Sequence, residues 1–157
     1  MDTKKTVLIV DDDALVLESI DLHLSAVDDF QTLRALGSVG ASSHMLNARH
    51  IDIIIADVIL AGSLTGIDLS QEAIEQYPAI AVVVITADPE VHCAEIPERG
   101  VLLRKPFDGG QLLEAIDEAS RRAHAGSAHE LNPRCQGLND SGLNDSAPDI
   151  EKYPPAA

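Results

Sequence analysis

Aromatic side chains and basic residues are scarce in this sequence of 157 residues. Aromatics make up 3%, with no Trp, so the core must be aliphatic and too few rings remain to stack on single-stranded nucleic acid. The 11 Lys and Arg face 26 Asp and Glu, and the net charge of −15 repels phosphate backbones and anionic lipid. These deficits argue against nucleic acid and membrane surfaces as partners and favour proteins and divalent cations.

Cysteine is scarce too, and no apolar run is long enough to cross a membrane. Cys93 and Cys135 are too few for a disulfide framework or a four-cysteine metal site, and we expect both to be reduced. The N-terminus is unlike a signal peptide, because its only apolar stretch is Val7–Val10 and Asp residues follow. Hydrophobic residues make up 45%, enough for a core, and we expect a cytoplasmic globular protein.

Short apolar runs alternate with helical patterns over residues 1–123. The runs are rich in β-branched residues and lack polar alternation, which is typical of parallel strands covered on both faces. They lie at Val7–Val10, Ile51–Ala56, Ala81–Ile85 and Val101–Leu103, with a weaker one at Phe30–Ala35. Helical patterns lie at Leu15–Val27, Ser38–Ala48, Ile67–Tyr77, Glu90–Glu98 (short) and Leu112–Ala119. The alternation predicts one α/β domain with a doubly wound, five-stranded parallel sheet and right-handed crossovers.

Residues 124–157 differ in kind from this domain. They are rich in Gly, Ser, Asn and Pro, and they contain the tandem repeat GLNDS-GLNDS at residues 137–146. Neither helical nor strand periodicity is present, which predicts a disordered tail, either simply solvated or used for docking. We expect no output domain here, because the segment has no basic patch, helix-turn-helix pattern or second core.

Polar residues follow four of the five apolar runs. Ligands of an open parallel sheet bind beyond the carboxyl ends of its strands, so these residues are predicted to converge. Asp11, Asp12 and Asp13 follow the first run, Asp57 the third, Thr86 the fourth and Lys105 the fifth. Their convergence at one edge is more informative than any one of them.

Together, these residue types favour a phosphoryl-acceptor site. Asp11, Asp12 and Asp57 would repel one another, and a hard divalent cation such as Mg²⁺ relieves the repulsion while drawing in phosphate oxygens. A carboxylate can itself be the nucleophile and form an aspartyl phosphate. The Thr86 hydroxyl and the Lys105 ammonium would then hold the phosphoryl oxygens.

Structural roles explain some of these residues singly. Asp13 stands directly before a helical pattern, and we predict that it caps that helix. Lys105 precedes Pro106, and an X-Pro bond after a strand can be cis and fix the direction of the preceding side chain. A cap, a turn residue or a solvated charge would each be ordinary alone, whereas the complete set favours a site.

Four short motifs identify a resemblance to a known family. They read VLIVDD at residues 7–12, IIIAD at 53–57, VITA at 84–87 and LRKPF at 103–107. In this order and spacing they resemble the receiver domain of two-component response regulators, over roughly residues 4–123. The resemblance implies a CheY-like (βα)5 fold, related to flavodoxin, and a phosphoryl donor that is a sensor histidine kinase or a histidine phosphotransfer protein.

The resemblance also implies a Mg²⁺ site, which Mn²⁺ could fill. Asp12 is similar to the family's direct metal ligand, and Asp11 to the acid that acts largely through water. The phosphoacceptor position, Asp57, would bind the ion as well. The backbone carbonyl of Ile59 would supply a further ligand.

The resemblance assigns the reacting groups as follows. Asp57 is similar to the phosphoacceptor, Thr86 to the switch hydroxyl and Lys105 to the lysine that pairs first with the carboxylate and then with the phosphoryl group. Such a domain catalyses only its own phosphorylation and dephosphorylation. Phosphorylation would switch a protein-binding surface near the fourth and fifth βα units, for a downstream protein that the sequence does not name. The chain would act as a monomer or as a phosphorylation-dependent dimer.

Two positions depart from the family pattern or refine it. Leu102 stands where the family often has an aromatic residue coupled to the switch hydroxyl. Ile59, two residues past the phosphoacceptor, is apolar and could shield an acyl phosphate from water, which predicts slow loss of the phosphoryl group.

Two alternatives remain open at this point. One is a phosphohydrolase of the haloacid dehalogenase type, with Asp11 as nucleophile and Asp13 as acid/base, although this assigns no role to Asp57. The other is a binding module with the same fold that works without phosphorylation, although the complete set of five site residues argues against it.

Overall fold

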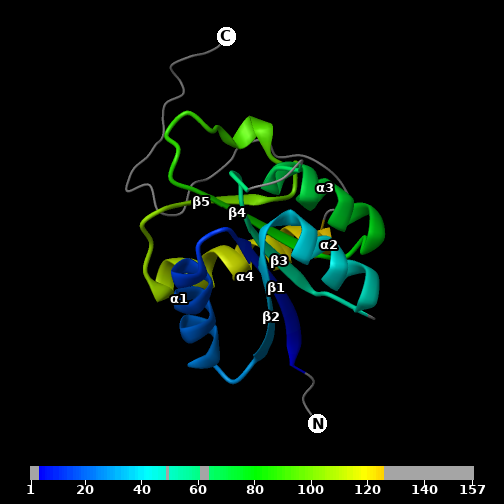
Figure 1. The fold of residues 1–157 in the computed structure, drawn as a ribbon, viewed down its shortest axis with the longest axis vertical. Coiled ribbons are helices and arrows are strands. Elements are labelled where there is room, and N and C mark those ends of the chain that lie inside the picture. The colour runs from blue at the N-terminus through cyan, green and yellow to red at the C-terminus, as the bar shows by residue number, and fades with distance from the viewer. Residues whose placement is uncertain (1–3, 49, 61–63, 126–157) are drawn as a thin grey trace.

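A single parallel sheet of five strands forms the centre of the molecule (Figure 1). The structure is a computed structural model, and it describes residues 4–48, 50–60 and 64–125. The sheet has the order β2-β1-β3-β4-β5, and its strands are β1 (Lys5–Asp11), β2 (Phe30–Leu36), β3 (Ile53–Asp57), β4 (Ala81–Thr86) and β5 (Val101–Arg104). The predicted fold class, a five-stranded doubly wound α/β domain, is confirmed.

Four α-helices cover the two faces of the sheet in the part of the chain that the structure describes. They are α1 (Ala14–Ser25), α2 (Gly37–Asn47), α3 (Gly66–Gln76) and α4 (Gly109–Ala125). Helices α2 and α3 pack on one face, and α1 and α4 pack on the other (Figure 1). Alternate residues of β3 point into the two layers, Ile54 into the first and Ile55 into the second, and neither is exposed. Burial on both faces is why β3 and β4 are continuously apolar up to their last residues, whereas the edge strand β2 is only partly buried.

Side-chain caps fix where three of the helices begin. Asp13 caps α1 as predicted, because its Oδ1 accepts the N–H of Leu15 at 2.9 Å. Thr65 and Asp68 form a capping box at the start of α3. Asp108 Oδ1 accepts the N–H of Gln111 at 2.8 Å at the start of α4. Because these helices follow the carboxyl ends of strands, their capping residues lie at that edge of the sheet.

The short helix expected around Glu90–Glu98 is confirmed only in part. The chain between β4 and β5 contains only a single 3-10 turn, η1 (Cys93–Glu95). Pro97 holds the residue before it, Ile96, in extended conformation at φ −96° and ψ 167°, so a helix cannot continue past Glu95. This crossover is therefore a loop that packs Val91 and Ile96 onto the core.

Two further expectations bear on the described residues and the tail. Cys93 is disulfide-bonded, in contrast to the reduced thiol expected from the sequence, and Cys135 lies outside the described residues. The tail predicted at 124–157 also lies outside them from residue 126 onward. Among the described helices, none combines the length and apolarity that a membrane span requires.

Candidate functional site

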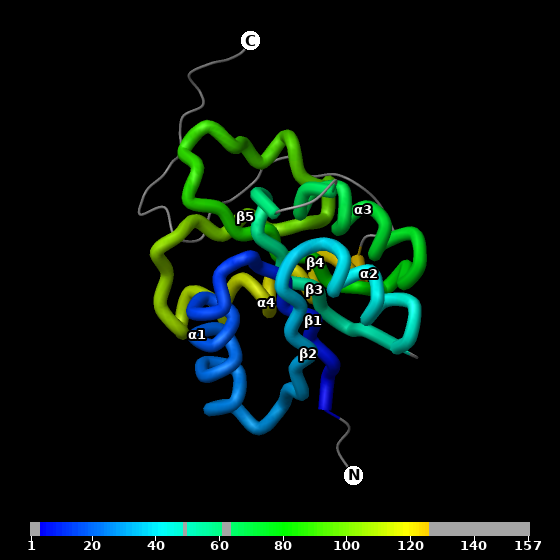
Figure 2. Tube along the Cα trace, viewed as in Figure 1, coloured from blue at the N-terminus to red at the C-terminus, as the bar shows by residue number. Residues whose placement is uncertain are grey.

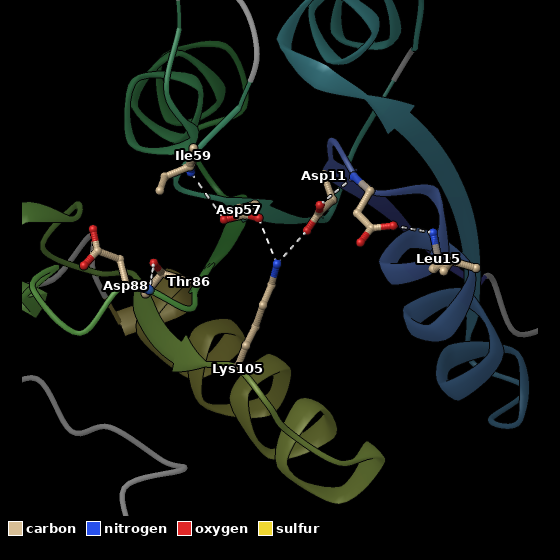
Figure 3. Close-up of polar contacts among 8 residues, drawn as sticks. Asp11, Leu15, Asp57, Ile59, Thr86, Asp88 and Lys105 are labelled. Carbon is tan, nitrogen blue, oxygen red and sulfur yellow. Dashed lines mark hydrogen bonds and ion pairs between the residues drawn. The ribbon is translucent and has the colours of Figure 1, made fainter.

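Four predicted site residues meet at the carboxyl edge of the sheet (Figure 3). Asp11 ends β1, Asp57 ends β3, Thr86 ends β4, and Lys105 follows β5 directly. The parallel register brings these ends side by side, since Asp57 is paired with Ile85 and Thr86 with Arg104. The prediction that these strand ends converge at one edge of the sheet is therefore matched by the geometry, and the roles of the residues stay a prediction.

Lys105 joins two carboxylates that come from different strands. Its Nζ lies 2.9 Å from Asp57 Oδ2 and 3.2 Å from Asp11 Oδ2 (Figure 3). The side chain of Asp11 is only 2% exposed, that of Asp57 12% and that of Lys105 22%. Partial burial strengthens such charge-assisted hydrogen bonds relative to those at an open surface. The Lys105–Pro106 peptide bond is cis, as the sequence had suggested it could be.

Local turns hold the second oxygen of each carboxylate. Asp11 Oδ1 accepts the backbone N–H of Asp13 at 2.9 Å, and Asp57 Oδ1 accepts that of Ile59 at 3.3 Å (Figure 3). Each carboxylate thus has one oxygen fixed by its own strand end and the other directed at Lys105. The orientation of both groups is set before any ligand arrives.

The charges within this cluster perturb two pKa values. Burial, and then the negative charge of Asp57, raises the pKa of Asp11 above its ordinary value, although the Asp13 amide and the charge of Lys105 oppose the shift. Burial by itself lowers the pKa of Lys105, but its hydrogen bonds and charge interactions with Asp57 and Asp11 outweigh burial, and the net shift is upward. The site is thus short of positive charge, since one ammonium serves two carboxylates.

Thr86 is fully buried and lies beside the cluster without joining it. Its Oγ1 accepts the backbone N–H of Asp88 at 3.0 Å (Figure 3). The backbone carbonyl of Thr86 accepts the N–H of Lys105 at 2.9 Å, which ties the two strand ends together. Leu102, at the position where an aromatic residue was considered, is buried in the core at 3% exposure.

Gly66 is a site residue that the sequence reasoning missed. A Cβ on Gly66 would lie 1.9 Å from the carbonyl oxygen of Asp57 and 2.6 Å from its carbonyl carbon. Helix α3 therefore begins in direct contact with the backbone of Asp57, which only glycine permits. Its signal in the sequence was weak: a Gly directly after the helix cap Thr65.

The fold and this edge of the sheet define a class of phosphoacceptor signalling domains, and comparison with known proteins agrees. The family model described as "Response regulator receiver domain" matches residues 7–117. The chain belongs to this family. Membership implies two-component signalling and interaction with a histidine kinase or a histidine phosphotransfer protein. A search of curated proteins finds no match.

Solved structures give the same result for the fold. A response regulator receiver domain protein from Clostridium thermocellum is 27% identical over 76% of this chain and 97% of its own, with a TM-score of 0.63. A response regulator receiver protein from Sinorhizobium medicae WSM419 is 22% identical over 76% of this chain and 97% of its own, with a TM-score of 0.69. Chemotaxis response regulator CheY4 of Vibrio cholerae is 24% identical over 74% of this chain and 99% of its own, with a TM-score of 0.65. The fold is CheY-like.

The family match rules against the phosphohydrolase alternative. That alternative required Asp13 as an acid/base, but the side chain of Asp13 is exposed and caps helix α1. It also left Asp57 without a role, whereas Asp57 is held by Lys105 in the cluster. The phosphorylation-independent binding module has the same fold and is separated by experiment below.

Receiver domains generally bind Mg²⁺ at acidic residues, and Asp11 and Asp57 fit such an ion. These two carboxylates share one positive charge, the Lys105 ammonium. Burial also raises the pKa of Asp11, so its ionised form is disfavoured without a further cation. Mg²⁺ commonly uses one or two carboxylates and completes its shell with water. The described residues contain no group of three or more acidic, His or Cys side chains arranged to hold a metal. Asp12 is exposed, so its inclusion with the Ile59 carbonyl in the ligand set stays a prediction.

Proposed function

We propose that this protein is a response regulator that accepts a phosphoryl group on Asp57. The donor is a phosphohistidine on a sensor histidine kinase or a histidine phosphotransfer protein, and the reaction depends on Mg²⁺ or Mn²⁺. The observation that carries the proposal is the pairing of Asp57 with Lys105 at 2.9 Å, beside the buried Asp11 at the same strand edge. In this protein the only reaction catalysed is the gain and loss of its own phosphoryl group.

The chemistry is a transfer between two nucleophiles. An oxygen of Asp57 attacks the phosphorus, the P–N bond of the phosphohistidine breaks, and its electron pair returns to the imidazole, which leaves an acyl phosphate on Asp57. The Ile59 amide holds one carboxylate oxygen in place, and Lys105 neutralises charge on the other. A bound Mg²⁺ ion supplies further positive charge for the phosphoryl oxygens, with Asp11 and Asp57 as candidate ligands.

Phosphorylation changes the hydrogen-bond preference of Thr86. Its hydroxyl now serves the amide of Asp88, and a new dianion on Asp57 would offer it a stronger, charge-assisted partner. Movement of Thr86 and Lys105 toward the phosphoryl group would alter the surface formed by β4, β5 and the loop between them. A downstream protein would read that surface.

Output through protein contact fits the charge of the chain. The net charge of −15 disfavours DNA and anionic membranes, so we propose neither as a partner. Within the proposal, residues 1–123 form the receiver domain. The protein works in the cytoplasm, as a monomer or as a dimer formed on phosphorylation.

A small acyl phosphate such as acetyl phosphate tests the proposal directly. The full chain is incubated with this donor with and without Mg²⁺, and the modified residue is mapped by mass spectrometry after chemical trapping of the acyl phosphate. Mg²⁺-dependent modification of Asp57 is the expected result. Modification of Asp11 would instead restore the phosphohydrolase alternative, and no modification at all would favour the phosphorylation-independent module.

Asp11→Asn is expected to abolish stabilisation by Mg²⁺. In the wild type, Mg²⁺ at about 100 times its dissociation constant should raise the free energy of unfolding by about 2.7 kcal/mol. The variant should show no such rise, because it lacks the buried carboxylate whose charge the ion relieves. Thermal unfolding with and without Mg²⁺ measures this, and Asp13→Asn is the matched control, since Asn also caps helices. A Mg²⁺ shift that survives in Asp11→Asn would contradict the assignment of Asp11 to the metal site.

Ile59→Asn is expected to speed the loss of the phosphoryl group. The Ile59 side chain is 63% exposed, two residues past Asp57, and an amide there could hydrogen-bond a water molecule near the acyl phosphate. One added hydrogen bond in the transition state corresponds to about a fivefold faster rate. Dephosphorylation of trapped acyl phosphate over time measures it, with Ile59→Leu as the apolar control. A rate for Ile59→Asn equal to or slower than that of wild type would show that shielding plays no part.

A further inference from the structure

The loop between β4 and β5 (residues 87–100) is held by arginine side chains where the other crossovers have α-helices. Figure 2 shows it as the light-green excursion beyond the ends of the strands. Its only regular element is the three-residue turn η1. Arg122 Nη1 donates to the carbonyl of Gly100 at 2.7 Å, at the end of the loop nearest β5. Arg104 holds the opposite end, next to the site.

Arg104 binds two backbone carbonyls at once. Its Nη1 donates to the carbonyl of Asp88 at 3.1 Å, and its Nη2 to that of Val91 at 2.7 Å. A guanidinium is planar and rigid, so two such bonds fix the separation and direction of the carbonyls that accept them. Val91 is itself 8% exposed and packs on the core, which leaves this stretch of loop little freedom.

Asp88, whose carbonyl accepts from Arg104, is also held by Thr86 through its amide. Thr86 and Arg104 are direct neighbours across β4 and β5. The N–H of Asp88 donates to Thr86 Oγ1 at 3.0 Å, while the carbonyl of Asp88 accepts from Arg104. Asp88 therefore links the hydroxyl at the site to the guanidinium that anchors the loop.

This linkage sets a cost for any movement of Thr86. If Thr86 Oγ1 moves toward a phosphoryl group on Asp57, the hydrogen bond that it accepts from the Asp88 amide is kept only if the loop moves with it. The bonds from Arg104 to the loop carbonyls resist that movement of the loop. An interaction present in one state and weakened in the other biases the equilibrium between them.

We propose that Arg104 is a positioning residue for the phosphoacceptor site. The two hydrogen bonds from its guanidinium to the loop carbonyls stabilise the conformation in which Thr86 Oγ1 accepts the Asp88 amide. It thereby opposes the switched conformation and lowers affinity for a phosphoryl group at Asp57. This inference rests on the proposed function of Asp57, and it adds a residue that acts through the loop without touching the reacting atoms.

Hydrogen exchange of the unphosphorylated full chain tests whether the two hydrogen bonds from Arg104 hold the loop. In Arg104→Met, which keeps an unbranched apolar stem, the backbone amides within residues 88–92 (all but Pro89, which has none) should exchange about tenfold faster than in wild type. Arg104→Lys should give an intermediate rate, because a single ammonium cannot reproduce both bonds. Arg122→Met, which removes the anchor at the far end of the loop, should leave residues 88–92 unchanged. Unchanged exchange of 88–92 in Arg104→Met would overturn the proposal.

The phosphoryl analogue beryllofluoride, with Mg²⁺, tests the coupling to the site. Its affinity should rise about fivefold in Arg104→Met, rise less in Arg104→Lys, and stay at the wild-type value in Arg122→Met. Equal or weaker affinity in a folded Arg104→Met would overturn the proposal and leave the function of Asp57 standing. Absence of binding by wild type would overturn both. If Arg104→Met fails to fold, Arg104→Lys decides the question, because it must also raise the affinity for beryllofluoride.

Discussion

Asp57→Asn is expected to abolish Mg²⁺-dependent phosphorylation, with a loss of at least about a thousandfold in rate. The Asn amide has the shape of the carboxylate but lacks the negative charge and the second oxygen with which to attack phosphorus. Asp11 is not expected to take over, because its side chain is only 2% exposed, whereas that of Asp57 is 12% exposed. Incorporation from acetyl phosphate, followed by intact-protein mass spectrometry, measures the effect.

The fold should survive this substitution, which makes the result interpretable. Lys105 keeps Asp11 as a partner at 3.2 Å, and Asp11 loses the neighbouring charge that helps to raise its pKa. Asp28→Asn is the matched control: Asp28 is 94% exposed, pairs with Lys4, and should be phosphorylated like wild type. Incorporation in Asp57→Asn equal to that in the control would remove Asp57 from the reaction and leave the binding-module alternative.

The parts of the site that the sequence predicted are those fixed by strand ends. A strand buried on both faces is a continuous apolar run, so the residue that ends it is visible in the sequence as the first polar one. Asp57 after Ala56 and Thr86 after Ile85 were located in this way. Parallel order then brings such ends together without any knowledge of side-chain contacts.

The contacts that a side chain makes with distant backbone could not be predicted in this way. Nothing in the sequence marks Arg104 as more than an exposed basic residue. Its guanidinium nevertheless donates to the carbonyls of Asp88 and Val91, which lie 16 and 13 positions earlier. The pattern around Glu90–Glu98 suggested a short helix, whereas the structure has only the three-residue turn η1 there. The extended conformation that proline imposes on Ile96 prevailed over that weak periodicity.

Gly66→Ala is expected to destabilise the fold by about 3 kcal/mol and to lower phosphorylation with it. The new methyl group would lie 1.9 Å from the carbonyl oxygen of Asp57, far inside contact distance. The helix cannot simply move away, because the N–H of Gly66 donates to the carbonyl of Val58 at 2.9 Å and Val58 is tied in turn to Ile85. Any relief must therefore displace the backbone of Asp57, which moves the reacting carboxylate away from Lys105.

The same Gly→Ala substitution at a second helix start separates this clash from the ordinary gain in helix propensity. Gly110 lies in the first turn of α4, and a Cβ there meets only Asp108 Oδ1 at 3.4 Å. Gly110→Ala should thus stabilise the protein by about 0.5–1 kcal/mol through helix propensity alone. Urea unfolding of both variants measures the difference, and opposite signs are expected from the same chemical change. If Gly66→Ala were as stable as Gly110→Ala, helix α3 would not be in contact with the end of β3. The geometry of Asp57 would then depend on its own turn and on Lys105 alone.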